Sequence, residues 1–325
     1  MDRESKMKDV HLHFTGSLSQ DYVFQQLKDK NPNFLKQYSV QNGNDLGILF
    51  RNMFSDNYKI NQQIFNTIYT LVQSVTKPSK NDNIRETYRI ATHNLTMNLI
   101  RHGITDYTII SGPDVDINNT YERFLGMIMG FEDTKKTYKN SHGQILITFI
   151  RNDKGILKNY SIPLLQDICK LLCEEPFKSR CVGFDISGYE YPNTELLNSN
   201  LNTLSEIIEA KRSHNLQKTI GLHAGEIITG TAVDSLYDDY FIKLSKLKID
   251  NIGHGTYLWS NTRNKNLLKM FAGKTRFDIC PVSNELLTPI KNVQKYIHNL
   301  KESGIEYTSN LDDPLIFNNW QIHQR

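Results

Sequence analysis

Short β-type runs alternate with longer helical stretches along most of the chain, and this alternation limits the folds that the chain can adopt. The runs that we interpret as strands are residues 8–14, 106–112, 144–151, 180–187, 218–225, 248–255, 275–283 and 304–312. Strands that alternate with helices form βαβ units and a parallel sheet. Eight such units in 325 residues predict an α/β fold, a (β/α)8 barrel of the TIM type.

The interval between the first two predicted strands is too long for one helix. Its pattern predicts extra helices near residues 44–58 and 60–76, followed by a helix at 84–102. Within 46–54, apolar residues fall on one helical face, which favours core packing. Alternatively, this face is a lid that closes over a planar ligand, and Phe50 and Phe54 are then substrate-binding candidates. Amphipathic helices are also predicted at 193–215 and 284–303.

Composition excludes several classes of protein. Hydrophobic residues make up 38% and charged residues 22% of the chain, which is enough for a core and unlike a disordered chain. The apolar runs at 124–131 and 145–150 are too short to span a membrane, and residues 1–9 do not resemble a signal peptide. The four cysteines do not form a disulfide framework, and the net charge of +3 is not clustered. We therefore expect one cytoplasmic domain over 1–325, with no membrane or nucleic-acid partner.

Histidines and acids gather at the predicted carboxyl ends of the strands, where barrels of this type carry their functional residues. His11 and His13 are two apart on a strand, so both can bind one metal ion from the same side. His223 and Asp312 end other predicted strands. Three imidazole nitrogens and a carboxylate suit a divalent ion such as Zn²⁺. Taken singly, each histidine is equally explained as a hydrogen-bonded core residue.

Other ionisable groups lie beside these candidates. Glu226 follows His223 by three residues and could exchange protons with a substrate, although an acid is also common near a helix start. His254 lies between two glycines, as a ligand-contacting or a turn histidine would. Asp313 adjoins Asp312 in a sequence that elsewhere would be an ordinary turn. Asp185 ends the fourth predicted strand.

These residues belong to motifs that occur in one order along the chain. The motifs are HLHFTGSLS (11–19), GFDISGYE (183–190), HAGE (223–226), GHGT (253–256), CPVSN (280–284) and NLDDPLIF (310–317). Together they resemble those of the adenosine deaminase family.

The resemblance implies a zinc aminohydrolase of purine salvage, which converts adenosine to inosine and ammonia on a (β/α)8 barrel. The ligands that it implies for one Zn²⁺ per chain are His11, His13, His223 and Asp312. Glu226 would protonate the purine ring, while His254 and Asp313 would orient the attacking water. Asp313 and the backbone at Gly188 would contact the base. Cytidine-type deaminases differ, because their Pro-Cys-x-x-Cys spacing is absent here.

The sequence departs from the family pattern at the sugar end of the ligand. Thr15 stands where adenosine-specific members have an acid, and a neutral hydroxyl would not repel a 5′-phosphate. The segments at 15–17 and 253–258 are closer to the methyl-AMP deaminase branch, whereas HAGE is closer to the adenosine branch. The alternative substrate is therefore AMP or an N-substituted AMP. Tyr189 also stands where an acid is common.

The chain stops twelve residues after Asp313, so the eighth helix of the barrel is missing from the sequence. Either the chain is a fragment, or apolar residues cover the barrel seam, for example across a contact in a homo-oligomer. These residues are Ile316, Phe317, Trp320 and Ile322. The missing helix also favours a second alternative, an inactive metal-binding barrel that acts as a scaffold, but the intact Glu226 argues against it. A two-metal phosphoesterase-like barrel is disfavoured, because the fourth strand ends in Asp185 rather than a lysine.

Overall fold

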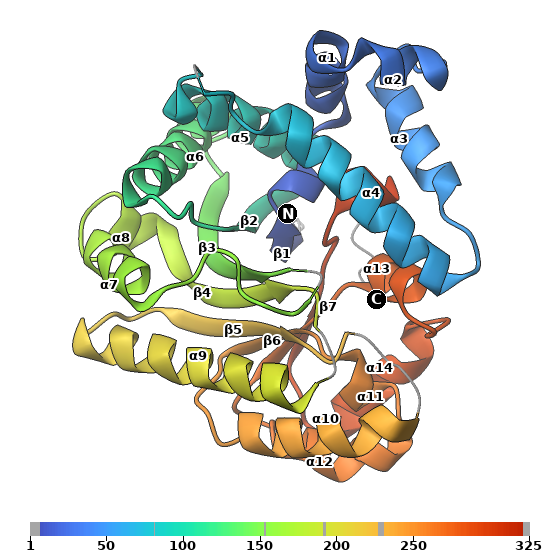
Figure 1. The fold of residues 1–325 in the computed structure, drawn as a ribbon, viewed down its shortest axis with the longest axis vertical. Helices are drawn as coiled ribbons and strands as arrows, with labels where there is room; N and C mark the ends of the chain where they lie inside the picture. Colours follow the sequence, from blue (N-terminus) through green and yellow to red (C-terminus); the bar gives the residue numbers. More distant parts are fainter. Residues whose placement is uncertain (1–6, 81, 153, 191–192, 227–230, 321–325) are drawn as a thin grey trace, which may run out of the picture.

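Eight parallel strands form the centre of the molecule, in the order in which they occur along the chain (Figure 1). The computed structural model describes residues 7–80, 82–152, 154–190, 193–226 and 231–320. The strands are β1 (Met7–His13), β2 (Ile104–Ser111), β3 (His142–Arg151), β4 (Cys181–Gly188), β5 (Thr219–Ala224), β6 (Asn251–His254), β7 (Arg276–Ile279) and β8 (Tyr307–Ser309). The predicted barrel is therefore confirmed.

Helices surround the strands on the outside (Figure 1). They are α5 (Ile84–Arg101), α6 (Ile117–Thr137), α7 (Ile162–Leu171), α8 (Phe177–Arg180), α9 (Thr194–Ser213), α10 (Thr231–Leu244), α11 (Thr256–Trp259), η2 (Thr262–Asn264), α12 (Lys265–Lys269), α13 (Pro281–Leu287) and α14 (Gln294–Glu302). The helix α9 shows why such segments form. The Asn193 side chain caps its first turn, and Leu197, Leu204 and Ile207 are buried on one face.

Two predictions are wrong near β7. The predicted strand at 275–283 ends at Ile279, because Pro281 begins helix α13 and cannot donate a hydrogen bond to a neighbouring strand. The predicted helix at 284–303 is divided into α13 and α14, and Pro289 lies between them. A proline prevents the regular hydrogen bonding of a helix, which accounts for the division.

The two extra helices predicted near 44–58 and 60–76 are present as α3 (Gly43–Met53) and α4 (Tyr58–Thr76). They are preceded by three elements that were not predicted, η1 (Thr15–Ser17), α1 (Gln20–Lys30) and α2 (Pro32–Gln37). The helix α4 packs against η1, which follows β1, and against α13, which follows β7. The amides of Asn61 and Gln62 donate to the carbonyls of Leu286 and Leu287 at 2.9 and 2.8 Å. The helix α4 therefore lies across the carboxyl ends of the strands (Figure 1).

The last strand meets the first without a regular ladder. Asp312 pairs with Leu12 in an isolated bridge, with hydrogen bonds from His13 N to Asp312 O at 3.1 Å and from Asp312 N to His11 O at 3.2 Å. The barrel thus closes at the residues that we singled out as metal ligands.

A short helix, α15 (Pro314–Phe317), is the one helix after β8 in the part of the chain that the structure describes. Its apolar side chains are buried, and the helix packs against α3, α4 and η1. Trp320 is buried and stacks on His102 with ring centroids 5.5 Å apart. Ile322, the other residue expected at this seam, lies outside the described residues.

All four cysteines are free, in agreement with the predicted absence of a disulfide framework. Among the described residues, we find no helix of sufficient length and apolarity to span a bilayer.

Candidate active site

The four predicted metal ligands lie together at the carboxyl ends of β1 and β5 and just after β8. The Nε2 atoms of His13 and His223 are 3.0 Å apart. Asp312 Oδ1 lies 3.4 Å from His13 Nε2 and 3.8 Å from His11 Nε2. Residues more than 200 positions apart in sequence therefore converge on one small region.

Their environment fits a divalent cation. His11 Nε2 and Asp312 Oδ1 are buried without a hydrogen-bond partner among the described residues. Burial, and then the neighbouring histidines, hold the pKa of His13 and His223 well below the usual range, so their rings are neutral and can coordinate a metal. Burial opposes a charge on His11, but the nearby carboxylate of Asp278 and the charge of Asp312 raise its pKa to about 9. The carboxylates thus favour a cation here, either a proton or a metal ion.

Further carboxylates support the histidine rings from behind. His223 Nδ1 lies 3.1 Å from Asp185 Oδ2, and Thr148 Oγ1 donates to the same oxygen at 3.0 Å. His11 Nδ1 lies 3.9 Å from Asp278 Oδ2, in the middle of β7. Such carboxylates orient histidine ligands and raise their basicity.

Asp278 was not predicted from the sequence. Burial alone would raise its pKa, but the nearby His11 and the hydrogen bonds from Arg276 lower it to about 2, so the carboxylate stays ionised. The distance from Arg276 Nε to Asp278 Oδ1 is 2.7 Å. Its sequence signal is an acid between Phe277 and Ile279 in a buried strand, where an unpaired charge would be costly.

His254 ends β6 beside these ligands. Its Nε2 lies 3.9 Å from Glu226 Oε1 and 4.0 Å from Asp312 Oδ2. Asn284 Nδ2 lies 2.9 Å from His254 Nδ1, and because an amide nitrogen can only donate, the proton of the neutral ring is on Nε2. Burial lowers the pKa of His254 to about 4, which keeps the ring neutral.

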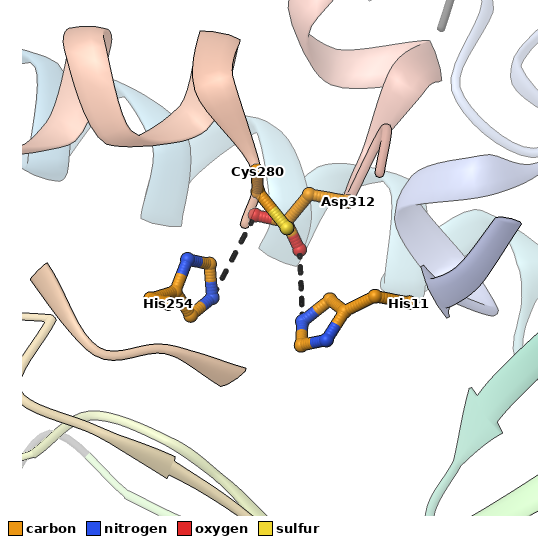
Figure 2. A group of neighbouring side chains, drawn as sticks. All are labelled: His11, His254, Cys280 and Asp312. Carbon is orange, nitrogen blue, oxygen red and sulfur yellow. Dashed lines mark ion pairs between the residues drawn. The ribbon is translucent and has the colours of Figure 1, made fainter. Parts of the chain in front are cut away.

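The backbone is strained at two of these positions. His254 has φ of 60° and Asp312 has φ of 68°, in the left-handed region that favours glycine. Non-glycine residues with such angles cluster at functional sites. Figure 2 shows both side chains with His11 and Cys280 around one small space.

Cys280 is the first residue of the motif at 280–284, and no role was predicted for it. Its sulfur lies within 4.8 Å of donor atoms of His11, His254 and Asp312. Burial, and then the charge of Asp312, raises the pKa of this thiol well above its usual range. A protonated thiol is a weak ligand, so the imidazoles and the carboxylate remain the better donors.

Thr15 and Asp313 lie on the β1 side of the site. A Cβ atom on Gly16 would be 1.6 Å from Asp313 Oδ1, so only glycine allows this approach. Burial and the charge of Asp312 raise the pKa of Asp313 well above its usual range. Tyr69 of α4, which was not predicted, lies close to Thr15, and burial together with the charge of Asp313 raises its pKa. This group brings two neutral hydroxyls beside a carboxyl.

The remaining predicted residues differ in exposure. The side chain of Glu226 is 24% exposed, and burial raises the pKa of its carboxyl, so it keeps its proton to higher pH. Gly188 is exposed at the end of β4 with φ of 84°. Phe54 is half-buried, with its ring 5.6 Å from Phe317, whereas Phe50 is completely buried in the core.

Comparison with known proteins supports this interpretation of the fold. The family model described as "Adenosine deaminase" matches residues 156–324. None of the curated proteins matches the chain.

Several solved structures resemble the chain at low sequence identity. An adenine deaminase from Arthrobacter aurescens is 16% identical with a TM-score of 0.63, covering 96% of this chain and 83% of that one. The N6-methyl-AMP deaminase from Arabidopsis thaliana is 16% identical with a TM-score of 0.62, covering 96% and 82%. An amidohydrolase from Burkholderia ambifaria with bound Zn is 12% identical with a TM-score of 0.58, covering 95% and 75%. At these identities the likeness shows the fold alone.

Proposed function

Since the chain belongs to the adenosine deaminase family, we propose that it hydrolyses adenosine to inosine and ammonia in purine salvage, with one bound zinc ion. The observation that carries this proposal is the convergence of three imidazoles and a carboxylate, with Glu226 and His254 beside them. We further propose that residues 1–325 act as one catalytic unit, because His11 and Asp312 come from opposite ends of the chain.

The residues that would hold the ion are His11, His13, His223 and Asp312. A zinc ion in such a site acts as a Lewis acid and lowers the pKa of water to about 7, which provides a nucleophile at neutral pH. The unpartnered donor atoms of His11 and Asp312 support this assignment.

Glu226 is the proposed proton donor to the purine ring. Burial raises the pKa of its carboxyl, which favours the protonated form needed for donation. Protonation of the ring nitrogen beside the reacting carbon disperses the negative charge that builds up as water adds. The backbone at Gly188 and the carboxyl of Asp313 would contact the base on either side.

His254 is proposed to orient the attacking water. With Asn284 bonded at Nδ1, the ring presents its Nε2 proton toward the space between Glu226 and Asp312. It would therefore donate a hydrogen bond to the water oxygen, while Asp313 accepts one from a water hydrogen.

The test is ammonia release from adenosine, AMP and adenine by the zinc-loaded protein. Glu226→Gln is the matched control, because it keeps the shape of the side chain but cannot donate the proton. We expect turnover of adenosine and its loss in the variant. If the metal is bound but no ammonia appears from any substrate, the proposal is wrong and the inactive metal-binding barrel is favoured.

A second candidate substrate is AMP or an N-substituted AMP. It is favoured by the neutral hydroxyls of Thr15 and Tyr69 beside Asp313. An acid in place of Thr15 would repel a phosphate, whereas a hydroxyl does not. The fold-level likeness to the N6-methyl-AMP deaminase is consistent with it.

Thr15→Asp separates the two substrates, with Thr15→Ser as the control that keeps the hydroxyl. If the nucleotide is the substrate, the aspartate variant should lose turnover of AMP and N6-methyl-AMP. Its turnover of adenosine should fall by a smaller factor. Equal losses for all substrates would contradict this role of Thr15.

A further inference from the structure

The β4 and β5 strands are paired along only a short part of their length. Their register comprises Gly183 with Thr219 and Phe184 with Ile220. On the other side of β4, the ladder with β3 continues to the pair of Arg151 and Gly188. Among the described residues, the carboxyl ends of β4 and β5 are therefore not joined by a ladder.

This gap lies within the candidate site. Asp185 and Gly188 are on its β4 side, while His223 and Glu226 are on its β5 side. Their relative positions cannot be set by strand pairing, so another set of contacts must set them.

Arg151 spans the gap from the end of β3. Its side chain is buried, with the residue 2% exposed. Nη2 donates to the carbonyls of Gly188 at 3.0 Å and of His223 at 2.9 Å, and Nε donates to that of Ser187 at 3.3 Å. The planar guanidinium thus holds both strand ends at once, in a geometry that a lysine cannot reproduce.

Glu190 spans the same gap just beyond β4. It is 1% exposed, and its Oε2 accepts hydrogen bonds from Gly225 N at 2.6 Å and from Tyr237 Oη at 3.1 Å. Gly225 lies between His223 and Glu226 with φ of 66°. A Cβ atom there would be 2.9 Å from the Phe241 ring, so the turn is closely packed as well as hydrogen-bonded.

The two charges are costly to bury, and their hydrogen bonding is incomplete. Arg151 Nη1 and Glu190 Oε1 are both buried without a partner among the described residues. Apolar side chains would fill this space without that cost. A role in stability alone therefore does not explain the pair.

We propose that Arg151 and Glu190, here called the β4–β5 clasp, are positioning residues that set Gly188, His223 and Glu226 relative to one another. This inference rests on the proposed deamination. Neither residue reacts: Arg151 acts through the carbonyls of Gly188 and His223, and Glu190 acts through the amide of Gly225.

Two variants test the clasp. Arg151→Lys keeps the charge but loses the planar fork, and Glu190→Met keeps the length of the side chain but removes the oxygens that accept from Gly225 N and Tyr237 Oη. The matched control is Arg180→Lys, because Arg180 Nη1 also donates to a strand carbonyl, that of Gly143 at 3.3 Å, but near the opposite ends of β3 and β4.

Three quantities are measured: kcat and KM for the deamination, the affinity for Zn²⁺ in competition with a chelator, and hydrogen exchange of the segment 222–226. We expect kcat of both clasp variants to fall about 100-fold with a smaller change in KM, as for a small misplacement of reacting groups. Zinc affinity should fall about tenfold, as when a partner of a metal ligand is lost. Exchange at 222–226 should become faster in both variants but not in the control.

Zinc affinity and exchange do not depend on turnover, so the clasp is tested even if the wild-type protein deaminates nothing. An absence of deamination would refute the proposed function only. The clasp is refuted if both variants keep wild-type zinc affinity and exchange, or change them no more than Arg180→Lys does. If Arg151→Lys does not fold, Glu190→Met alone decides.

Discussion

At the β8–β1 seam, backbone groups of the two strands bond directly to each other, whereas at the β4–β5 seam buried side chains span the gap. The first seam places Asp312 between His11 and His13 through main-chain hydrogen bonds. The second places His223 and Glu226 through Arg151 and Glu190. At the first seam the main-chain bonds are supplemented by the side chains of Asp9 and Asn310, which accept from Leu311 N and Val10 N. One half of the candidate site is therefore placed mainly by the backbone, and the other half depends on particular side chains.

This difference predicts where substitutions are tolerated. A change of the Asp312 or His13 side chain removes a functional group but leaves the main-chain bonds of these residues across the β8–β1 seam in place. A change at the β4–β5 seam moves functional groups that are themselves unaltered. Substitutions at the two seams should therefore reduce activity for different reasons.

The largest effect is expected from Asp312→Ala, which removes a proposed ligand but not the main-chain bonds of the seam. Activity should fall by at least about 10³-fold, because metal and nucleophile are lost together. Zinc content by atomic absorption should fall in parallel. Asp185→Asn, on the other seam, should cost only about 10- to 100-fold, because Asp185 acts through His223. Equal losses in the two variants would remove the distinction between ligand and supporting residue.

Gly16→Ala should disturb the β1 side of the candidate site, where Thr15 and Asp313 lie. The added methyl would meet Asp313, so the carboxyl must move, and we expect about a 100-fold loss of kcat with zinc still bound. Gly273→Ala is the control, since a Cβ atom there has no neighbour within 4 Å, and its φ of 67° adds a backbone strain that Gly16 does not have. If both variants lose activity equally, the loss does not come from contact with Asp313.

Asn284→Asp tests the residue that fixes the proton of His254, which lies between the two seams. An aspartate accepts a hydrogen bond from Nδ1 and moves the ring proton away from Nε2. We expect kcat to fall about tenfold with little change in KM, and zinc affinity to stay as in the wild type. Asn284→Gln is the control, because it keeps an amide but changes the length of the side chain. An equal loss in both variants would mean that the loss comes from altered packing, so the prediction requires a larger loss in Asn284→Asp.

The last prediction concerns stability. Glu190 at the β4–β5 seam and Asp9 at the β8–β1 seam are buried carboxyls, and burial raises the pKa of each to about 7. The folded state therefore binds more protons than the unfolded state between about pH 4 and 7. Stabilisation that is present below about pH 4 is lost as the pH rises through 7, by on the order of 3 kcal/mol per group.

Urea unfolding of the metal-free protein at pH 5 and 8 measures this loss. Glu190→Gln and Asp9→Asn should each flatten the pH dependence, and their effects should add because the seams are far apart in the barrel. Asp29→Asn, on the exposed side of α1, should leave it unchanged. If Glu190→Gln keeps the wild-type pH dependence, Glu190 is already ionised at pH 5 in the folded protein, and the prediction is wrong.

Sequence patterns were sufficient for the order of strands and for much of the site. The spacing of His11 and His13 on a strand, and the acids after predicted strand ends, depend on local periodicity, which a sequence displays directly. Of the extra helices after β1, α3 and α4 were predicted for the same reason, whereas α1 and α2 were not predicted. The strand at 275–283 and the helix at 284–303 were misjudged, because apolar periodicity continues through Pro281 and Pro289 while backbone hydrogen bonding does not.

The residues that sequence analysis missed act across the fold. Asp278, Asn284 and Tyr69 reach the site from a strand, a helix start and a distant helix, and no local pattern marks their target. Arg151 and Glu190 matter because a ladder stops early, which only the register reveals. Phe50 shows the converse, since its helical face was visible in the sequence but its complete burial was not.

The pairing of Asp312 with the first strand has a consequence for how the protein is made. About 300 residues separate His11 from Asp312, so a ribosome must synthesise both the first and the last strand before the two can meet. A nascent chain that has not reached Asp312 holds only the histidines of the proposed site, without the carboxylate. Closure of the barrel would then complete the zinc site, so that zinc binding and this late step of folding would be coupled.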